Sequence, residues 1–345
     1  MNHKIVDRKN LLDENGVLTE PGYATDLVFD YDRKDIHASK LRIKEWDYYL
    51  ITNKDYAVAL TIAYIGYMGL LSASIIDYKE PWQYTGSVPT LFPMGKLNAP
   101  VTSKIGDFTA TTKKADFKFY NDGKKRHLTC LYKNYFDKKD LEVDITLTDD
   151  KKDSMVIATP FFEKPTQFYY NQKINCMTAT GYAKLGDKVY NFDDEYSLAV
   201  LDWGRGVWSY NNTWFWGSMN TRLPDGRKFG FNIGYGFGNT QAASENMLFV
   251  DGKAHKLDQV TFNIPVDKDG KDDFMSDWKF TSNDGRLELD FKPIIDRSAV
   301  IDVKVMGSIQ HQVFGKFTGK VVLDDGSEIE LKDEIGFAEK VHNKW

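Results

Sequence analysis

Apolar and polar residues alternate with a period of two along many short stretches of the chain. Residues 116–120 read DFKFY, residues 142–148 read EVDITLT and residues 287–291 read LELDF. Successive side chains of a β-strand point to opposite faces, so this alternation predicts strands with one buried face. Sustained helical periodicity is hard to find. We therefore expect short helices at most, within a mostly antiparallel all-β fold.

Asp-Gly and Asn-Gly pairs separate many of these stretches, and such pairs are strong signals for tight turns between antiparallel strands. The pairs are Asn15-Gly16, Asp122-Gly123, Asp225-Gly226, Asp251-Gly252, Asp269-Gly270, Asp284-Gly285 and Asp325-Gly326. Alternating runs lie directly beside several of them. The sequence therefore predicts a succession of hairpins.

One segment, residues 57–76, is uncharged over about the length that crosses a bilayer. Two glycines, Gly66 and Gly69, two tyrosines and several Ser and Thr residues weigh against a transmembrane helix. We predict instead two buried strands joined near residues 66–69, and no integral membrane span.

The stretch from Leu201 to Phe249 differs from the rest because it is rich in tryptophan and glycine. With a period of two, residues 229–238 place large apolar side chains on one strand face and small residues on the other. The first face is Phe229, Phe231, Ile233, Tyr235 and Phe237, and the second is Gly230, Asn232, Gly234, Gly236 and Gly238.

A glycine-rich strand face needs a compensating reason, because glycine packs nothing and loses the most backbone entropy. Two interpretations remain open: a bent strand under another sheet, or a ligand lying close against the face. A nucleotide loop is excluded, because Asn239 replaces the third glycine of the GxGxxG fingerprint and no helical pattern follows. We expect no cofactor.

The length of 345 residues allows one large domain or two ordinary ones, and an apolar fraction of 42% supports a sizeable core. We expect two β lobes, residues 1–194 and 195–345, because the polar run at 191–195 interrupts the strand pattern. An aromatic fraction of 14% favours strands and apolar cavities over helical bundles.

Charge and cysteine content narrow the class of protein further. With a net charge of −5, the chain lacks the excess of basic residues that is typical of nucleic-acid-binding proteins, so we expect no nucleic-acid partner. The polar N-terminus lacks an apolar signal core. Cys130 and Cys176 are far apart and are expected to be buried thiols in the cytoplasm. The six histidines show no metal-ligand spacing, so we predict no metal site.

Several motifs together resemble one bacterial family, called domain of unknown function 2804. They are residues 42–49 (RIKEWDYY), 202–208 (DWGRGVW), 231–238 with 244–246, 251–253 with 255–257, and 336–339 (GFAE) with Trp345. That family is similar, more distantly, to tandem lipocalin-like β-barrel proteins that include carotenoid hydratases, tocopherol cyclases and lipid carriers. The resemblance implies two lipocalin-like, or calycin-like, antiparallel barrels or sandwiches packed together, with apolar ligands.

The hydratases and cyclases of the wider group use an acid that burial keeps protonated, and aromatic faces stabilise the resulting cation. Asp202 is the position that matches this acid, and Glu245 is a second candidate. The candidate ligand-binding residues are Trp46, Trp203, Arg205, Trp208, Tyr210, Trp214, Trp216, Asn232, Tyr235 and Asn246.

Arg205 favours a different role for Asp202, because an arginine beside a buried carboxylate keeps it ionised. A structural Asp202–Arg205 pair is the preferred interpretation, with acid catalysis and ligand positioning as alternatives. Glu245 is another possible partner for Arg205. Trp46 is interpreted as a packing residue or a residue between the lobes, and Asp47 as a surface or capping acid.

Three functions remain open at this stage. The first is binding of a hydrophobic small molecule, lipid or isoprenoid-like, in an apolar cavity. The second is an acid-dependent lyase or isomerase, of the hydratase or cyclase type, acting on an alkene-bearing lipid. The third is a scaffold without a ligand. The sequence leaves the oligomeric state open.

Overall fold

The computed structural model describes residues 2–91, 97–149, 153–303 and 306–344. Within these ranges the fold consists of strands and one short 3₁₀ helix, η1 (Arg33–Asp35), which confirms the all-β prediction. No helix in the described ranges is long and apolar enough to cross a bilayer.

The first lobe is built on a sheet of thirteen strands with the central order β7-β6-β5-β4-β15-β13-β11-β10-β9-β8. Its strands are β2 (Gly22–Ala24), β4 (Ile43–Thr52), β5 (Tyr56–Tyr64), β6 (Met68–Asp77), β7 (Trp82–Leu91), β8 (Phe108–Thr111), β9 (Ala115–Asn121), β10 (Lys125–Phe136), β11 (Lys139–Thr148), β12 (Met155–Pro160), β13 (Phe168–Leu185), β14 (Lys188–Phe192) and β15 (Leu198–Val207). A separate parallel pair, β1 (Lys9–Asn10) and β3 (Phe29–Asp30), lies beside it.

The second lobe is a sheet of nine strands in the order β19-β18-β17-β16-β24-β23-β22-β21-β20. Its strands are β16 (Asn211–Arg222), β17 (Lys228–Tyr235), β18 (Met247–Val250), β19 (Lys253–Lys256), β20 (Val260–Asn263), β21 (Trp278–Ser282), β22 (Leu287–Val303), β23 (Met306–Val322) and β24 (Glu328–Lys344). The chain changes sheet between β15 and β16, not at the predicted 194/195 boundary, because β15 pairs with β4 and β13.

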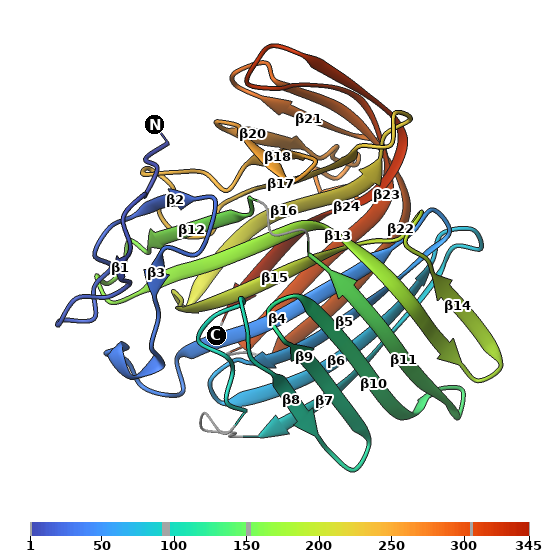
Figure 1. Ribbon diagram of the computed structural model, residues 1–345, viewed down its shortest axis with the longest axis horizontal. Coiled ribbons are helices and arrows are strands. Elements are labelled where there is room, and N and C mark those ends of the chain that lie inside the picture. Colours follow the sequence, from blue (N-terminus) through green and yellow to red (C-terminus); the bar gives the residue numbers. More distant parts are fainter. Residues whose placement is uncertain (1, 92–96, 150–152, 304–305, 345) are drawn as a thin grey trace.

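Each sheet curls until distant strands approach one another (Figure 1). In the first lobe the Tyr135 hydroxyl on β10 donates to the Tyr84 carbonyl on β7 at 2.7 Å. In the second lobe the rings of Tyr235 on β17 and Phe262 on β20 lie 5.5 Å apart. The molecule is therefore two lipocalin-like antiparallel barrels packed together, as predicted.

Glycines allow the long strands to bend where they cross their neighbours. Gly181 on β13 has a φ of +134°, and a Cβ there would lie 2.1 Å from the Asp144 carbonyl oxygen on β11. Gly319 on β23 has a φ of +144°, and a Cβ there would lie 2.3 Å from the Glu288 carbonyl oxygen on β22. Only glycine tolerates this backbone conformation together with so close an approach.

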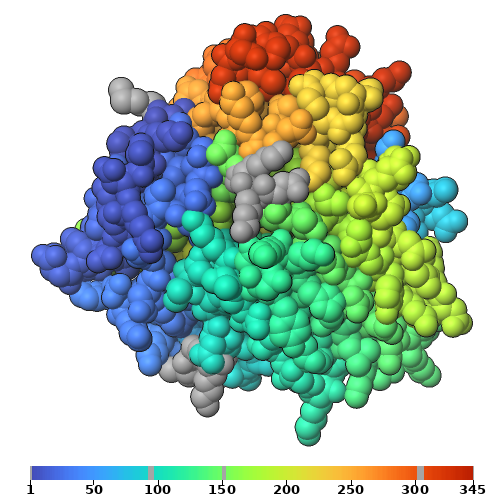
Figure 2. Space-filling view, viewed as in Figure 1, coloured from blue at the N-terminus to red at the C-terminus, as the bar shows by residue number. Residues whose placement is uncertain are grey.

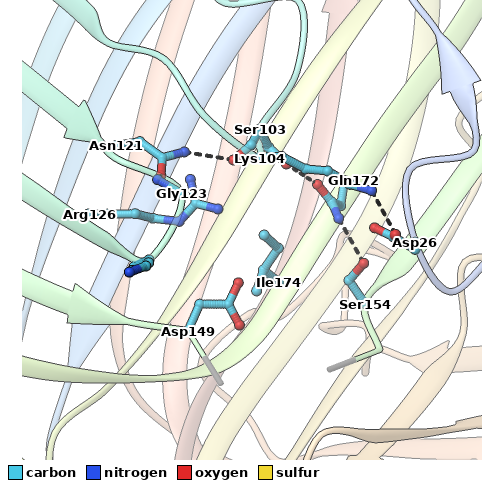
Figure 3. A pocket seen from close by; sticks show the side chains of 11 residues that line it. Asp26, Ser103, Lys104, Asn121, Gly123, Arg126, Asp149, Ser154, Gln172 and Ile174 are labelled. Carbon is cyan, nitrogen blue, oxygen red and sulfur yellow. Dashed lines mark hydrogen bonds and ion pairs between the residues drawn. The ribbon is translucent and has the colours of Figure 1, made fainter. Parts of the chain in front are cut away.

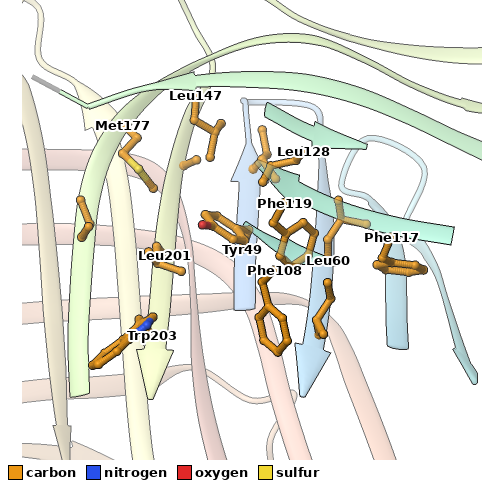
Figure 4. Packing of buried hydrophobic residues seen from close by; sticks show 14 of the residues in the cluster. Tyr49, Leu60, Phe108, Phe117, Phe119, Leu128, Leu147, Met177, Leu201 and Trp203 are labelled. Carbon is orange, nitrogen blue, oxygen red and sulfur yellow. The ribbon is translucent and has the colours of Figure 1, made fainter. Parts of the chain in front are cut away.

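Apolar side chains fill both barrels. Phe117, Leu128 and Trp203 belong to a large cluster inside the first (Figure 4). Phe231, Trp278 and Phe317 belong to the cluster inside the second. A third layer lies between the two sheets, and we name it the seam. Its large buried side chains are Tyr48, Tyr78, Met155, Tyr169, Trp208, Trp216, Phe237, Met247, Phe314 and Phe337.

The local predictions are confirmed at most turns. Five of the predicted pairs connect consecutive strands, namely those at 122, 225, 251, 284 and 325. Residues 57–76 form β5 and β6, joined by a turn at Gly66, and most of the segment is buried. Cys130 and Cys176 are free and buried.

The predicted glycine-rich strand is shorter than expected. β17 ends at Tyr235, because Gly236 (φ +90°) and Gly238 (φ +76°) turn the chain. Phe229, Phe231 and Ile233 face the second barrel as predicted. Phe237 does not share their face, since the turn directs its ring into the seam.

The N-terminal segment lies along one side of the molecule, against both lobes (Figure 2). Its strand β2 pairs with β12 of the first lobe. The His3 backbone N–H donates to the Ala242 carbonyl of the second lobe at 2.7 Å, and the Asn2 side chain accepts from the Ser244 N–H at 3.0 Å. The segment therefore links the two lobes.

The bend at Gly181 gives a direct test of the strand geometry. We expect Gly181→Ala to lower the free energy of unfolding by at least about 2 kcal/mol, because of both strain and a backbone clash. Gly226→Ala is the matched control, since Gly226 also has a positive φ (+87°) but nothing within 4 Å of a new Cβ. Urea unfolding measures both, and equal losses would contradict the assigned close approach.

Candidate functional site

The alternation along β15 divides its side chains between a barrel and the seam. Leu201, Trp203 and Arg205 point into the first barrel, where all three are 0% exposed. Asp202 and the neighbouring even-numbered positions point the other way, toward the second sheet. The same face receives Tyr48 of β4 and Lys173 of β13, since both pair in register with Asp202.

The preferred Asp202–Arg205 pair does not form, because the two side chains leave opposite faces of β15. Arg205 Nη2 instead contacts Asp47 Oδ1 at 3.1 Å, and its guanidinium lies 4.2 Å above the Trp203 ring. Asp47 is therefore a buried partner of Arg205 and not a surface or capping acid. Glu245 is not the partner of Arg205 either. Trp203 and Arg205 accordingly do not line the seam.

Asp202 is held by three donors from the first sheet. Lys173 Nζ lies 2.8 Å from Oδ1, and Asn171 Nδ2 donates to the same oxygen at 2.6 Å. Trp46 Nε1 donates to Oδ2 at 3.0 Å. A cation and two further donors thus engage both oxygens of this carboxyl group. Asp202 is thus paired as the sequence suggested, but with a lysine on the adjacent strand.

Lys173 connects this pair to the second sheet. Its Nζ lies 3.9 Å from the centre of the Trp216 ring on β16, which is a close cation–π contact. Its positive charge also acts on two buried carboxyl groups of the second lobe, Glu245 and Glu339. Three acids and one lysine therefore interact electrostatically in the seam, and all four are less than 9% exposed.

Glu339 has the strongest perturbation of the three acids. Burial raises its pKa from 4.5 to about 7, against a smaller opposing effect of the Trp214 hydrogen bond. Trp214 Nε1 donates to Oε1 at 3.1 Å, and Gln312 Nε2 donates to Oε2 at 3.0 Å. The Gln312 oxygen has no partner among the described residues. A reversed amide would therefore present an acceptor to protonated Glu339.

Glu245 lies in the loop between β17 and β18. Burial raises its pKa, and the nearby Lys173 charge partly opposes the rise. Its backbone carbonyl accepts from Asn232 Nδ2 at 2.8 Å, while Asn232 Oδ1 accepts from Trp216 Nε1 at 2.7 Å. Asn232 thus fixes the orientation of the Trp216 ring that receives Lys173.

Indole and phenol rings enclose these polar groups. Trp46 stacks on Tyr169 with ring centres 6.2 Å apart and an interplanar angle of 9°. Phe237 meets Tyr169, Trp208 and Trp214 edge-on at 4.5, 4.8 and 5.0 Å. Trp46 and Trp214 are half-buried, so the ring wall reaches solvent at these two residues. Trp46 therefore lies between the lobes, which was the second of its two interpretations, and also packs on Tyr169.

Gly204 makes room for this wall. It pairs with Trp46 across β15 and β4, and a Cβ at Gly204 would lie 1.9 Å from the Trp46 ring. The glycine of the DWGRG motif therefore allows the Trp46 indole to lie flat over β15 and reach Asp202. Any larger residue at this position would collide with the indole.

The glycine face of β17 is covered by the protein itself. A Cβ at Gly230 would lie 2.7 Å from Cys176 Sγ on β13, and one at Gly234 would lie 3.0 Å from a Glu245 carboxyl oxygen. Two interpretations of this face were open. The structure agrees with a bent strand that lies under another sheet. A ligand does not occupy this face at Gly230 and Gly234.

The remaining predicted residues lie away from the seam. Tyr210 is 44% exposed. Tyr235 stacks on Phe215 at the rim of the second barrel. Asn246 supports the loop, because its Oδ1 accepts from the Gly234 N–H at 2.7 Å.

Two central residues, Lys173 and Glu339, were not predicted as site residues. Lys173 is the one charged residue within residues 168–183, and that signal is present in the sequence, whereas Glu339 directly precedes Lys340 and has no such signal. Among the described residues, no group of three or more His, Cys, Asp or Glu side chains is arranged to hold a metal ion.

The fold and the seam define a tandem lipocalin-like β-barrel protein with a buried acid–lysine cluster between its barrels. The chain belongs to the family described as domain of unknown function DUF2804, whose model matches residues 2–345. Among curated proteins none matches the chain.

Solved structures with the same fold share little sequence with this chain. Kievitone hydratase from Nectria haematococca has a TM-score of 0.53 and 11% identity, with 98% of each chain covered. A putative AttH from Nitrosomonas europaea has a TM-score of 0.52 and 10% identity, covering 90% of this chain and 96% of that one. CghA has a TM-score of 0.52 and 10% identity, covering 98% and 97%. At these identities the likeness shows the fold alone.

The raised pKa of Glu339 predicts a specific pH dependence of stability. Because the pKa in the folded state (about 7) lies above the ordinary value of 4.5, protonated Glu339 contributes stability that is complete below pH 4.5. This contribution is lost as the pH rises through about 7, and it amounts to about 3 kcal/mol. We expect Glu339→Gln to remove that part of the pH dependence.

Urea unfolding at pH 4.5 and pH 8 measures this effect. Glu330→Gln is the matched control, since Glu330 is exposed on the same strand, β24. Identical pH dependence of the two variants would show that Glu339 has an ordinary pKa.

Proposed function

We propose that the protein binds a hydrophobic, alkene-bearing small molecule at the seam and acts on it by acid–base chemistry, as a lyase or isomerase of the hydratase or cyclase type. The observation that carries this proposal is Glu339, a buried carboxyl group with a pKa near 7 inside an aromatic wall. Such a group has the proton affinity that a general acid needs near neutral pH.

Glu339 is the proposed proton donor, in place of Asp202. Both oxygens of Asp202 are already engaged, by Lys173 and two further donors. Its negative charge lies close to Glu339 and contributes to keeping that group protonated. Asp202 therefore acts as a positioning and electrostatic residue in this proposal, as does Glu245.

The proposed reaction begins with transfer of the Glu339 proton to one alkene carbon. Positive charge then develops on the other carbon, and the ring faces of Trp46 and Trp214 stabilise it. The Trp216 face already holds a cation, the ammonium group of Lys173, which supports this use of the wall. Addition of water, or loss of a neighbouring proton, completes the reaction and returns a proton to Glu339.

Two observations support a hydrophobic ligand. The groups around the carboxyls are mainly indole, phenol and phenyl rings, which favour apolar and flat molecules. One protein with this fold is named as a hydratase, and water addition to an alkene fits a buried acid of this kind.

We also propose that the protein resides in the cytoplasm. The support for this is that its two cysteines are free, buried thiols, as is usual in a reducing compartment.

Deuterium incorporation tests the proposal even while the substrate is unidentified. The protein is incubated in D₂O with a panel of isoprenoid alkenes and with a hydrophobic metabolite extract, and the products are analysed by mass spectrometry. Because a general acid delivers a solvent-exchanged proton to carbon, we expect at least one compound to gain carbon-bound deuterium. We expect Glu339→Gln to reduce this rate by about 100-fold or more.

Glu330→Gln, which alters an exposed carboxyl on the same strand, should retain the full rate. If compounds bind in native mass spectrometry but none gains deuterium, the protein is a binding module and the enzymatic part is wrong. If Glu339→Gln exchanges deuterium as fast as the wild type, Glu339 is not the acid.

A further inference from the structure

A second polar site lies at one end of the first barrel, separate from the seam. A cavity of about 300 Å³ opens there between β10, β13 and the segment before β8. It is lined by Asp26, Ser103, Lys104, Asn121, Gly123, Lys124, Arg126, Asp149, Ser154, Gln172 and Ile174 (Figure 3). This volume is at the lower end of the range for small-molecule sites.

Arg126 is the unusual member of this lining. It begins the row of inward-facing residues on β10, followed by Leu128 and Cys130, and is only 6% exposed. Figure 3 shows its side chain extending from β10 toward Ile174 and Gln172. An arginine side chain carries five N–H donors, so a nearly buried one needs several acceptors.

The described residues supply few acceptors to Arg126. Its Nη1 approaches the Tyr49 hydroxyl at 3.5 Å, at the limit of a hydrogen bond, and its Nε has no partner within the described ranges. Leaving buried donors of a charged group unpaired is costly. The guanidinium therefore has unused capacity to bind an acceptor on the cavity side.

The charges inside the first barrel leave Arg126 without an acid of its own. Asp47 is taken by Arg205 at 3.1 Å, and Glu45 is taken by Arg33. The positive charge of Arg126 acts on Asp47 at longer range, without a direct contact. Among the described residues, Arg126 thus forms no direct ion pair at the base of the cavity.

The cavity rim adds positive charge. Lys104 and Lys124 are exposed in the lining, and Lys104 Nζ pairs with Asp26 at 2.7 Å. Asp149 is the second acidic residue, beside Asp26, in the described lining of the cavity. Among the described lining residues, three basic side chains, including Arg126, thus face two acidic ones. This described part of the lining therefore has a net positive charge.

Neutral polar groups of the wall are fixed by one another. Gln172 Nε2 donates to Ser154 Oγ at 2.8 Å, and the Gln172 oxygen accepts from Ser103 Oγ. Asn121 Nδ2 donates to the Ser103 carbonyl at 2.8 Å. These contacts hold the wall in place around Arg126, as a preformed site requires.

We propose that this cavity binds the oxyanion group, carboxylate or phosphate, of a small molecule, with Arg126 as its principal contact. A planar guanidinium binds both kinds of oxyanion through paired hydrogen bonds, and the lysines at the rim favour entry of an anion. This site is independent of the seam and of the function proposed there.

The test is isothermal titration calorimetry of the whole protein with two probes, inorganic phosphate and glutarate, at constant ionic strength. We expect saturable binding of at least one probe, and the tighter probe identifies the preferred oxyanion. Arg126→Gln should weaken that binding at least about 10-fold, because the charged hydrogen bonds are lost. Arg126→Lys should give an intermediate loss, since it keeps the charge without the paired geometry.

Arg227→Gln is the matched control, because Arg227 lies in an exposed turn of the second lobe and pairs with Asp225. It should leave the affinity unchanged. Circular dichroism checks that each variant is folded. If Arg126→Gln does not fold, titration of the wild type still decides whether the cavity binds an oxyanion. Absence of saturable binding to the wild type overturns the proposal, as does equal affinity of folded Arg126→Gln and wild type.

Discussion

The Lys173–Asp202 ion pair is the interaction around which the seam is arranged. It lies between two sheets, with both side chains at least nine-tenths buried, and Asn171 and Trp46 complete its hydrogen bonds. Removing two charges from water is expensive, and well-packed apolar residues often stabilise a protein as well as a buried pair does. Packing of the two lobes alone therefore does not explain this pair, and the proposed acid–base chemistry would give it a role.

The charges of the pair also act on two neighbouring acids, in opposite directions. Glu245 and Glu339 come from the second sheet and lie where the Asp202 charge opposes their ionisation and the Lys173 charge favours it. Burial has the largest effect on both and raises both pKa values. The cluster thus combines an acid held in an ion pair in the first lobe with an acid in the second whose pKa is raised to about 7. Such a division of roles is typical of sites that transfer protons.

Much of the architecture was predictable because its signals are local. Period-two alternation and the Asp-Gly pairs depend on neighbouring residues alone, and they identified the strands and most hairpins. The change of sheet after β15 could not be predicted in this way, because β15 returns to pair with β4, far away in the sequence, and no local signal reports that pairing. Glu339 was missed for the same reason, since its partners lie on β16 and β23.

The two faces of β15 are predictable from the sequence. Residues 202 and 205 are separated by an odd number of positions, so on a strand they point to opposite faces. The alternation that was applied to residues 229–238 also separates Asp202 from Arg205. For residues 201–207 the same alternation places Trp203 and Arg205 on one face of the strand. It places Asp202 on the other face, where its partner must be a cation from another strand.

The central claim is that a carboxyl group between the barrels is half protonated near neutral pH. Carbon-13 NMR of protein labelled at the glutamate side-chain carboxyl follows this directly, and the Glu339→Gln variant assigns the resonance. The account predicts one glutamate signal that titrates with a midpoint near 7 and disappears in the variant. A Glu339 signal that titrates near the ordinary value of 4.5 would contradict it.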